Sequence, residues 1–228
     1  MLNGYYTDKR CLMESMEPIF KDLTGYKRIY FDHPGVGMTK GYENIKNWEE
    51  MLNVIIKFIQ KVIPNERFLL VGRSFGGYMA QGILKKRRGL VDGLLLLCPL
   101  IELDRNKRDI DKDIKEINNT KKETDIRIKK EIIKSIENTD KDFMEKIRNK
   151  STFDSRLNEK FKKPVTILTG RQDQVVGYRD AYNILDNYPR ASYIVLDRGN
   201  HILHIFKTHI FNALVKEWIN RVENESYI

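Results

Sequence analysis

The sequence is poor in cysteine and histidine and has no long hydrophobic run, and each shortage excludes a class of protein. Its 228 residues contain two cysteines, Cys11 and Cys98, and four histidines. Two isolated thiols give neither a disulfide framework nor the spacing of a metal site, so we expect a reducing, cytoplasmic setting. The longest apolar stretch, within residues 94–101, contains a proline and is far too short to cross a bilayer. The first five residues lack the basic and apolar regions of a secretory signal.

Positive charge is abundant, but it is interspersed with negative charge. The net charge is +9, and residues 105–163 alone carry 19 Lys/Arg against 13 Asp/Glu. Aromatic residues do not alternate with these lysines, as they would in a groove for single-stranded nucleic acid. We therefore interpret the basic excess as a solvated helical surface and expect no nucleic-acid partner.

Short apolar runs alternate with helical patterns along the chain. Continuous apolar runs of this length are typical of strands buried on both faces of a sheet. They lie at residues 28–31, 68–71, 93–98, 165–169 and 192–196. Helical spacing of apolar residues appears at 48–62, 78–84 and 206–218. The alternation predicts an α/β fold with a mainly parallel, doubly wound sheet.

One segment interrupts this alternation. More than sixty residues separate the strand expected to end at Cys98 from the one expected to begin at Val165. They are polar, rich in lysine and helical in pattern, with isoleucines such as Ile114 and Ile117 at helical spacing. A structureless loop of that length is improbable. We predict a helical cap or lid over residues 104–160, inserted into a core made of residues 1–103 and 161–228.

A candidate nucleophile follows the apolar run that ends at Val71. The string Gly72-Arg73-Ser74-Phe75-Gly76 has the pattern Gly-x-Ser-x-Gly and lies between an expected strand and an expected helix. In that context the sharp turn lifts the Ser74 hydroxyl above the sheet, and the glycines allow close approach of neighbouring backbone. The start of the helix supplies free N–H groups, so the Phe75 N–H can stabilise an oxyanion.

With this elbow, nearly the whole chain resembles the α/β-hydrolase family, and within it the serine hydrolases of esterase type. The loop Asp32-His33-Pro34-Gly35-Val36-Gly37 is similar to the family's D-x-x-G-x-G loop. A dinucleotide-binding fingerprint is excluded, because its third glycine would fall on Lys40.

The resemblance also implies the partners of Ser74. The family places its general base after the last strand, where His201 stands, with His204 three residues later as the alternative. The acid follows an earlier strand in a G-x-x-D-x-x-V pattern, which here gives Asp173. Some relatives carry the acid after the preceding strand, so Glu102 and Asp104 remain alternatives. The order Ser, Asp, His along the chain is the order usual for this fold.

The N-terminus and the elbow depart from the family pattern. Gly4 fits the glycine of the family's oxyanion segment, and Asn3 stands where histidine is usual. The resemblance makes the Tyr5 N–H the second oxyanion donor and implies that roughly the first two strands of the family are missing from the chain. Arg73 in the elbow is a gate, an anion contact or a solvated side chain.

These residues predict a serine hydrolase that forms an acyl-enzyme. We expect a small or medium carboxylic ester as substrate, with no cofactor, no metal and no membrane partner. Thioester, carbon–carbon and amino-terminal peptide cleavage use the same triad and stay open. The alternative function is a catalytically impaired protein of the same fold that binds a small molecule under the cap.

Overall fold

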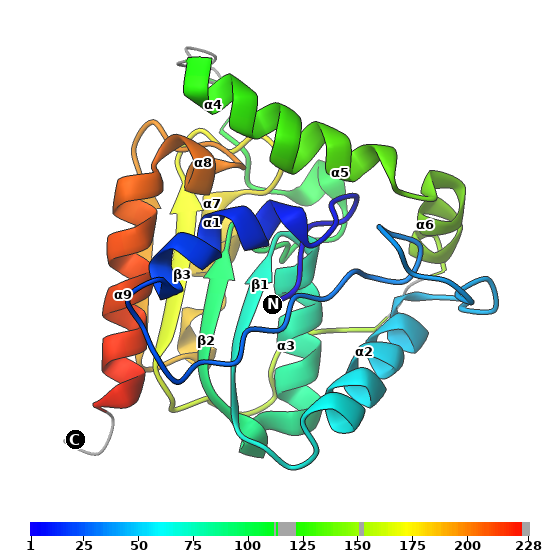
Figure 1. The fold of residues 1–228 in the computed structure, drawn as a ribbon, viewed down its shortest axis with the longest axis horizontal. Helices are drawn as coiled ribbons and strands as arrows, with labels where there is room; N and C mark the ends of the chain where they lie inside the picture. Colours follow the sequence, from blue (N-terminus) through cyan, green and yellow to red (C-terminus); the bar gives the residue numbers. More distant parts are fainter. Residues whose placement is uncertain (112, 114–121, 151–152, 225–228) are drawn as a thin grey trace.

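A four-stranded parallel sheet forms the centre of the molecule (Figure 1). The structure, a computed structural model, describes residues 1–111, 113, 122–150 and 153–224. The strands are β1 (Phe68–Arg73), β2 (Val91–Leu97), β3 (Val165–Gly170) and β4 (Ala191–Leu196), and they lie side by side in chain order. Four of the five apolar runs are thus confirmed as parallel strands, and every residue of β3 is buried, as its apolar run requires.

Helices flank this sheet in two groups. They are α1 (Arg10–Phe20), α2 (Trp48–Val62), α3 (Phe75–Arg87), α7 (Tyr178–Tyr182), α8 (Leu203–Phe206) and α9 (Thr208–Glu223). Helix α1 packs against α9, which lies on β2 and β3, while α2 packs against α3, which lies on β1 (Figure 1). Within the described residues, no helix combines the length and the apolarity that crossing a membrane requires.

The fifth expected strand, at residues 28–31, is wrong. Only Phe31 makes a bridge there, with Leu2, and Leu2 also bridges Gly72 of β1. Residues 1–3 therefore lie between this segment and β1, held by the Leu2 N–H to the Val71 carbonyl (2.9 Å) and by the Phe31 N–H to the Met1 carbonyl (3.2 Å). A partner of so few residues cannot support a longer ladder. The arrangement nevertheless brings residues 3–5 beside the end of β1.

Two helices near the ends of the chain, α1 and α8, were not predicted from the sequence. Helix α1 was not expected, and it buries Leu12, Met16 and Ile19 although it includes Pro18. The helix expected at 206–218 is confirmed as α9, and a separate short helix, α8, precedes it, because Lys207 (φ −119°, ψ 37°) breaks the helical conformation between the two. The break places residues 201–206 in a separate turn and short helix above the sheet.

The segment between β2 and β3 contains short helices. The described ones are a 3₁₀ turn at Arg105–Lys107, α4 (Lys122–Arg127), a π-helical turn at Ile128–Ile133, α5 (Lys134–Glu137) and α6 (Lys141–Arg148). The π-helical turn packs against α1. Ile114 and Ile117, on which part of the cap prediction rests, lie outside the described residues.

Candidate active site

Ser74 occupies a strained turn between β1 and α3. Its φ of 51° and ψ of −119° form a conformation that non-glycine residues rarely adopt. The turn is tight, because a Cβ on Gly72 would collide with the Gly76 backbone and a Cβ on Gly76 with the Leu2 carbonyl. Such strain persists only where the surroundings enforce it, and it is common at active sites.

Ser74, His201 and Asp173 form a hydrogen-bonded relay. The Ser74 Oγ lies 3.0 Å from His201 Nε2, and His201 Nδ1 lies 2.8 Å from Asp173 Oδ2. The serine and the carboxylate are buried, and 14% of the histidine side chain is exposed. Three residues expected on separate strand ends thus meet at the carboxyl edge of the sheet.

The surroundings of Asp173 keep its carboxyl group ionised. Burial alone would raise the pKa of this group, but the charge interaction and hydrogen bond with His201 act in the opposite direction. Asp173 Oδ1 also accepts the backbone N–H groups of Val175 (2.8 Å) and Val176 (3.0 Å). Together these contacts hold the pKa of Asp173 below its usual value, so the carboxylate can orient the imidazole and balance its charge.

The alternative residues lie in other contacts. Glu102 accepts the N–H of Asp104, and Asp104 accepts the N–H of Asn106 at the start of a 3₁₀ turn. His204 is fully buried in α8, where its Nε2 lies 3.8 Å from Cys11 Sγ. The structure therefore brings Asp173 and His201, rather than these alternatives, to Ser74.

Both expected oxyanion donors lie on segments that border Ser74. Phe75 is the first residue of α3, where the helix leaves its N–H groups without a helical partner. Gly4 passes so close to the elbow that a Cβ on it would stand 3.6 Å from Ser74 Cβ. The Tyr5 ring packs edge-on against the Phe75 ring, with centroids 5.0 Å apart, and the Tyr5 hydroxyl donates to the Met144 carbonyl.

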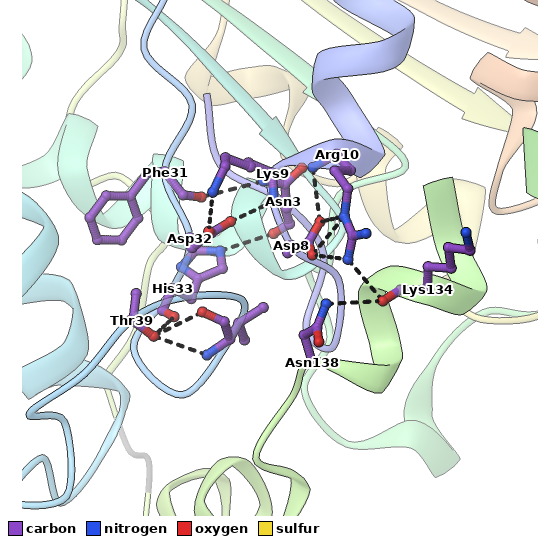
Figure 2. A network of polar contacts seen from close by, with 11 residues as sticks. Asn3, Asp8, Lys9, Arg10, Phe31, Asp32, His33, Thr39, Lys134 and Asn138 are labelled. Atoms are coloured by element: carbon purple, nitrogen blue, oxygen red, sulfur yellow. Dashed lines mark hydrogen bonds and ion pairs between the residues drawn. The ribbon is translucent and has the colours of Figure 1, made fainter. Parts of the chain in front are cut away.

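His33 supports residues 3–5, the expected oxyanion segment, and the sequence did not suggest this contact (Figure 2). Its Nε2 lies 3.0 Å from the Asn3 carbonyl oxygen. Burial lowers the pKa of His33 to about 4, so near neutral pH the ring is uncharged and Nε2–H can donate to that oxygen. The Asn3 side chain in turn accepts from Leu12 N–H (3.2 Å) and donates to the Phe31 carbonyl (3.3 Å). The asparagine that replaces the family's histidine therefore fixes the local backbone.

Charged groups join this segment to α1 and to the helices after residue 122 (Figure 2). Asp32 accepts from the Lys9 backbone N–H (2.6 Å) and ammonium group (2.7 Å). Asp8 binds the Arg10 guanidinium, which also donates to the Lys134 carbonyl (2.8 Å). The network couples the backbone beside Ser74 to α5.

One group of potential metal ligands coincides with the relay. Cys98, Asp173 and His201 offer ligand atoms within 4.8 Å of one another. The two His201 ring nitrogens already face Ser74 and Asp173, and Cys98 Sγ lies 3.9 Å from the Asn200 carbonyl oxygen.

Comparisons with known proteins identify the class that the sheet, elbow and relay define. Residues 13–155 match the profile of the family described as serine aminopeptidase, S33. The chain belongs to this family and is a hydrolase with the α/β-hydrolase fold. The match includes Ser74, whereas Asp173 and His201 lie beyond it. No curated protein matches the sequence.

Solved structures share the fold over almost the full chain. An α/β superfamily hydrolase from Oenococcus oeni PSU-1 is 26% identical, with a TM-score of 0.87, 98% of this chain covered and 91% of that one. A meta-cleavage product hydrolase from Pseudomonas fluorescens IP01 is 20% identical (TM-score 0.71; 96% and 89% covered). A thermophilic esterase from Thermogutta terrifontis is 15% identical (TM-score 0.65; 97% and 88% covered). At those identities the last two show the fold alone.

Proposed function

We propose that this hydrolase cleaves small or medium carboxylic esters, with Ser74 as nucleophile, His201 as general base and Asp173 as the orienting acid. The observation that carries the proposal is the continuous relay from Ser74 Oγ through the imidazole to Asp173, at 3.0 and 2.8 Å. Both distances lie within proton-transfer and hydrogen-bond reach.

The proposed reaction is acyl transfer to water. His201 removes the Ser74 proton as Ser74 Oγ attacks the ester carbonyl carbon, and the oxyanion is stabilised by the N–H groups of Phe75 and Tyr5. The imidazolium then gives its proton to the departing alcohol, which leaves an acyl-enzyme. Water, deprotonated by the same imidazole, attacks the acyl carbon and releases the acid and the Ser74 hydroxyl.

Residues 104–160 are proposed to act as a cap over the site. The Tyr5 hydroxyl donates to the Met144 carbonyl in α6, and Tyr6 hydrogen-bonds Glu145 of the same helix. These contacts support a cap that rests on the proposed oxyanion segment and lines the acyl pocket. We further propose a cytoplasmic protein with a small-molecule substrate, because Cys11 and Cys98 are both unpaired thiols.

The proposal is tested with a chromogenic ester and a fluorophosphonate probe. Ser74→Ala and His201→Ala are expected to lower kcat for p-nitrophenyl butyrate by about 10⁴-fold or more, and Ser74→Ala to abolish labelling. His209→Ala, at an exposed position of α9, is the matched control and should behave as wild type.

Three results would contradict the proposal. Ester turnover that persists in Ser74→Ala would remove the serine from the mechanism. A folded wild type that neither labels nor turns over the ester would favour the impaired, ligand-binding alternative. Faster cleavage of an aminoacyl p-nitroanilide than of the ester would move the substrate class to amino-terminal peptides.

A further inference from the structure

Arg73, the residue before the nucleophile, is an unusual occupant of the elbow. Its exposed fraction is 3%, so it is not the solvated side chain that the sequence allowed. Burial of a cation is costly unless it is paired. Arg73 is the last residue of β1 and adjoins Ser74, so the cost of burying its charge falls at the proposed catalytic centre.

The guanidinium joins the two segments that flank Ser74. Nη2 donates to the carbonyl oxygen of His201 (3.2 Å), which belongs to the loop that carries the base. Nη1 lies 2.5 Å from the place where a Cβ on Gly4 would stand, so the glycine makes room for the guanidinium beside the proposed oxyanion segment. A single side chain thus contacts both the base loop and the backbone before Tyr5.

The titratable groups around Arg73 are electrically neutral near pH 7. Burial raises the pKa of the Cys11 thiol, with the charge of Arg73 acting against this shift. Burial also raises the pKa of Cys98 well above its usual value. The pKa of His204 is well below its usual value because of burial first and the charge of Arg73 second.

The nearby carboxylates have other partners. Asp173 hydrogen-bonds His201, at 2.8 Å. Glu131 accepts from Arg127 at 2.6 Å, and Asp8 binds Arg10 at 2.5 Å.

Within the described part of the chain, Arg73 forms no ion pair, and its buried Nε has no hydrogen-bond partner. Its charge is buried beside Ser74, where the guanidinium hydrogen-bonds the His201 carbonyl.

We propose that Arg73 is a positioning residue that holds the His201 loop and the Gly4 backbone on either side of Ser74. The proposal rests on the proposed function. The His201 ring faces Ser74 from the elbow, Asp173 and Cys98 from the ends of the neighbouring strands, and is close to His204 of α8.

The test compares Arg73→Met and Arg73→Lys with wild type, and Arg87→Met at an exposed position of α3 is the matched control. Arg73→Met is expected to lower kcat and the rate of fluorophosphonate labelling by about 10- to 100-fold, with KM changed less than about twofold. Arg73→Lys keeps one charged donor in place of the forked guanidinium, so kcat should recover only in part.

Each result decides the proposal. An Arg73→Met variant with wild-type kcat would overturn it, and so would a loss confined to KM, which would place Arg73 in substrate binding. If Arg73→Met fails to fold by circular dichroism, Arg73→Lys decides, since a wild-type kcat in that variant would contradict the proposal. A wild type that is not labelled overturns the proposed function itself, whereas labelled wild type with unaffected variants overturns only the role of Arg73.

Discussion

At the scale of single residues, the relay depends on how Asp173 holds His201. Three hydrogen bonds fix the carboxylate, two of them from backbone N–H groups just after the strand. One oxygen is thus occupied by the backbone and the other is free to receive the imidazole N–H. This division of the two oxygens sets the tautomer that presents Nε2 as a base to Ser74.

Asp173→Asn is expected to lower kcat by about 10³- to 10⁴-fold with little change in KM, because the amide no longer favours that tautomer. Ester hydrolysis at pH 7 measures the effect. Asp186→Asn is the control. It lies at an exposed position of the 3₁₀ turn Leu185–Asn187, before β4, and should retain wild-type rates. A wild-type kcat in Asp173→Asn would exclude the carboxylate from the mechanism.

The sequence predicts the relay residues but not those that support them. Ser74, Asp173 and His201 follow strands at positions that a linear motif records, and the alternatives are few because the chain has four histidines. Arg73 and His33 differ, since their roles depend on which backbone each side chain meets after folding. Nothing in the local sequence shows that the guanidinium faces the His201 carbonyl or that His33 faces Asn3.

At the scale of elements, the elbow works because three pieces of backbone cross within contact distance. Gly76 of α3 lies against the Leu2 carbonyl, the same oxygen that accepts the Arg73 N–H (3.0 Å). Both neighbours are backbone, which cannot move aside as a side chain can. The glycine is therefore required by packing of helix against strand rather than by its own dihedral angles.

Gly76→Ala is expected to destabilise the protein and displace residues 1–5 from the elbow, since the added methyl group overlaps the Leu2 carbonyl. Urea unfolding should show a lower midpoint, and fluorophosphonate labelling of Ser74 should be slower. Gly89→Ala is the matched control, because a Cβ there meets nothing within 4 Å. If Gly76→Ala and Gly89→Ala were equally stable, the backbone around residue 76 would accommodate the methyl group without a loss of stability.

Element prediction succeeded where an apolar run pairs along its length and failed where its neighbour is short. The runs of β1 to β4 each pair with a parallel neighbour over several residues, although β4 is only half-buried. The run at 28–31 has only residues 1–3 as its neighbour, so no ladder forms. Helix α1 contains Pro18, a residue that usually ends a helix, which weakens its pattern in the sequence.

At the scale of the whole molecule, buried histidines link stability to pH. His33 and His204 are fully buried, and burial lowers the pKa of both, to about 4 for His33. In the unfolded chain a histidine has a pKa of about 6.5. Between these values the unfolded state binds protons that the folded state does not, so stability is complete above about pH 6.5 and is lost as the pH falls toward 4.

His33→Gln is expected to flatten this decline, whatever its effect at neutral pH, because one of the titrating groups is removed. The urea midpoint measured from pH 7 to about pH 4 gives the slope. His209→Gln, at an exposed position of α9, should keep the wild-type slope. Parallel curves for His33→Gln and wild type would show that His33 is not held neutral in the folded protein.

The relay has a consequence for the order in which the molecule assembles. Ser74 and His201 are 127 residues apart in the chain, so their hydrogen bond closes a loop that contains most of the sheet. Closing so long a loop carries an entropic cost that only the completed sheet can repay. A nascent chain that has emerged only as far as β3 contains Ser74 without His201. The relay forms only when β4 and the turn after it dock.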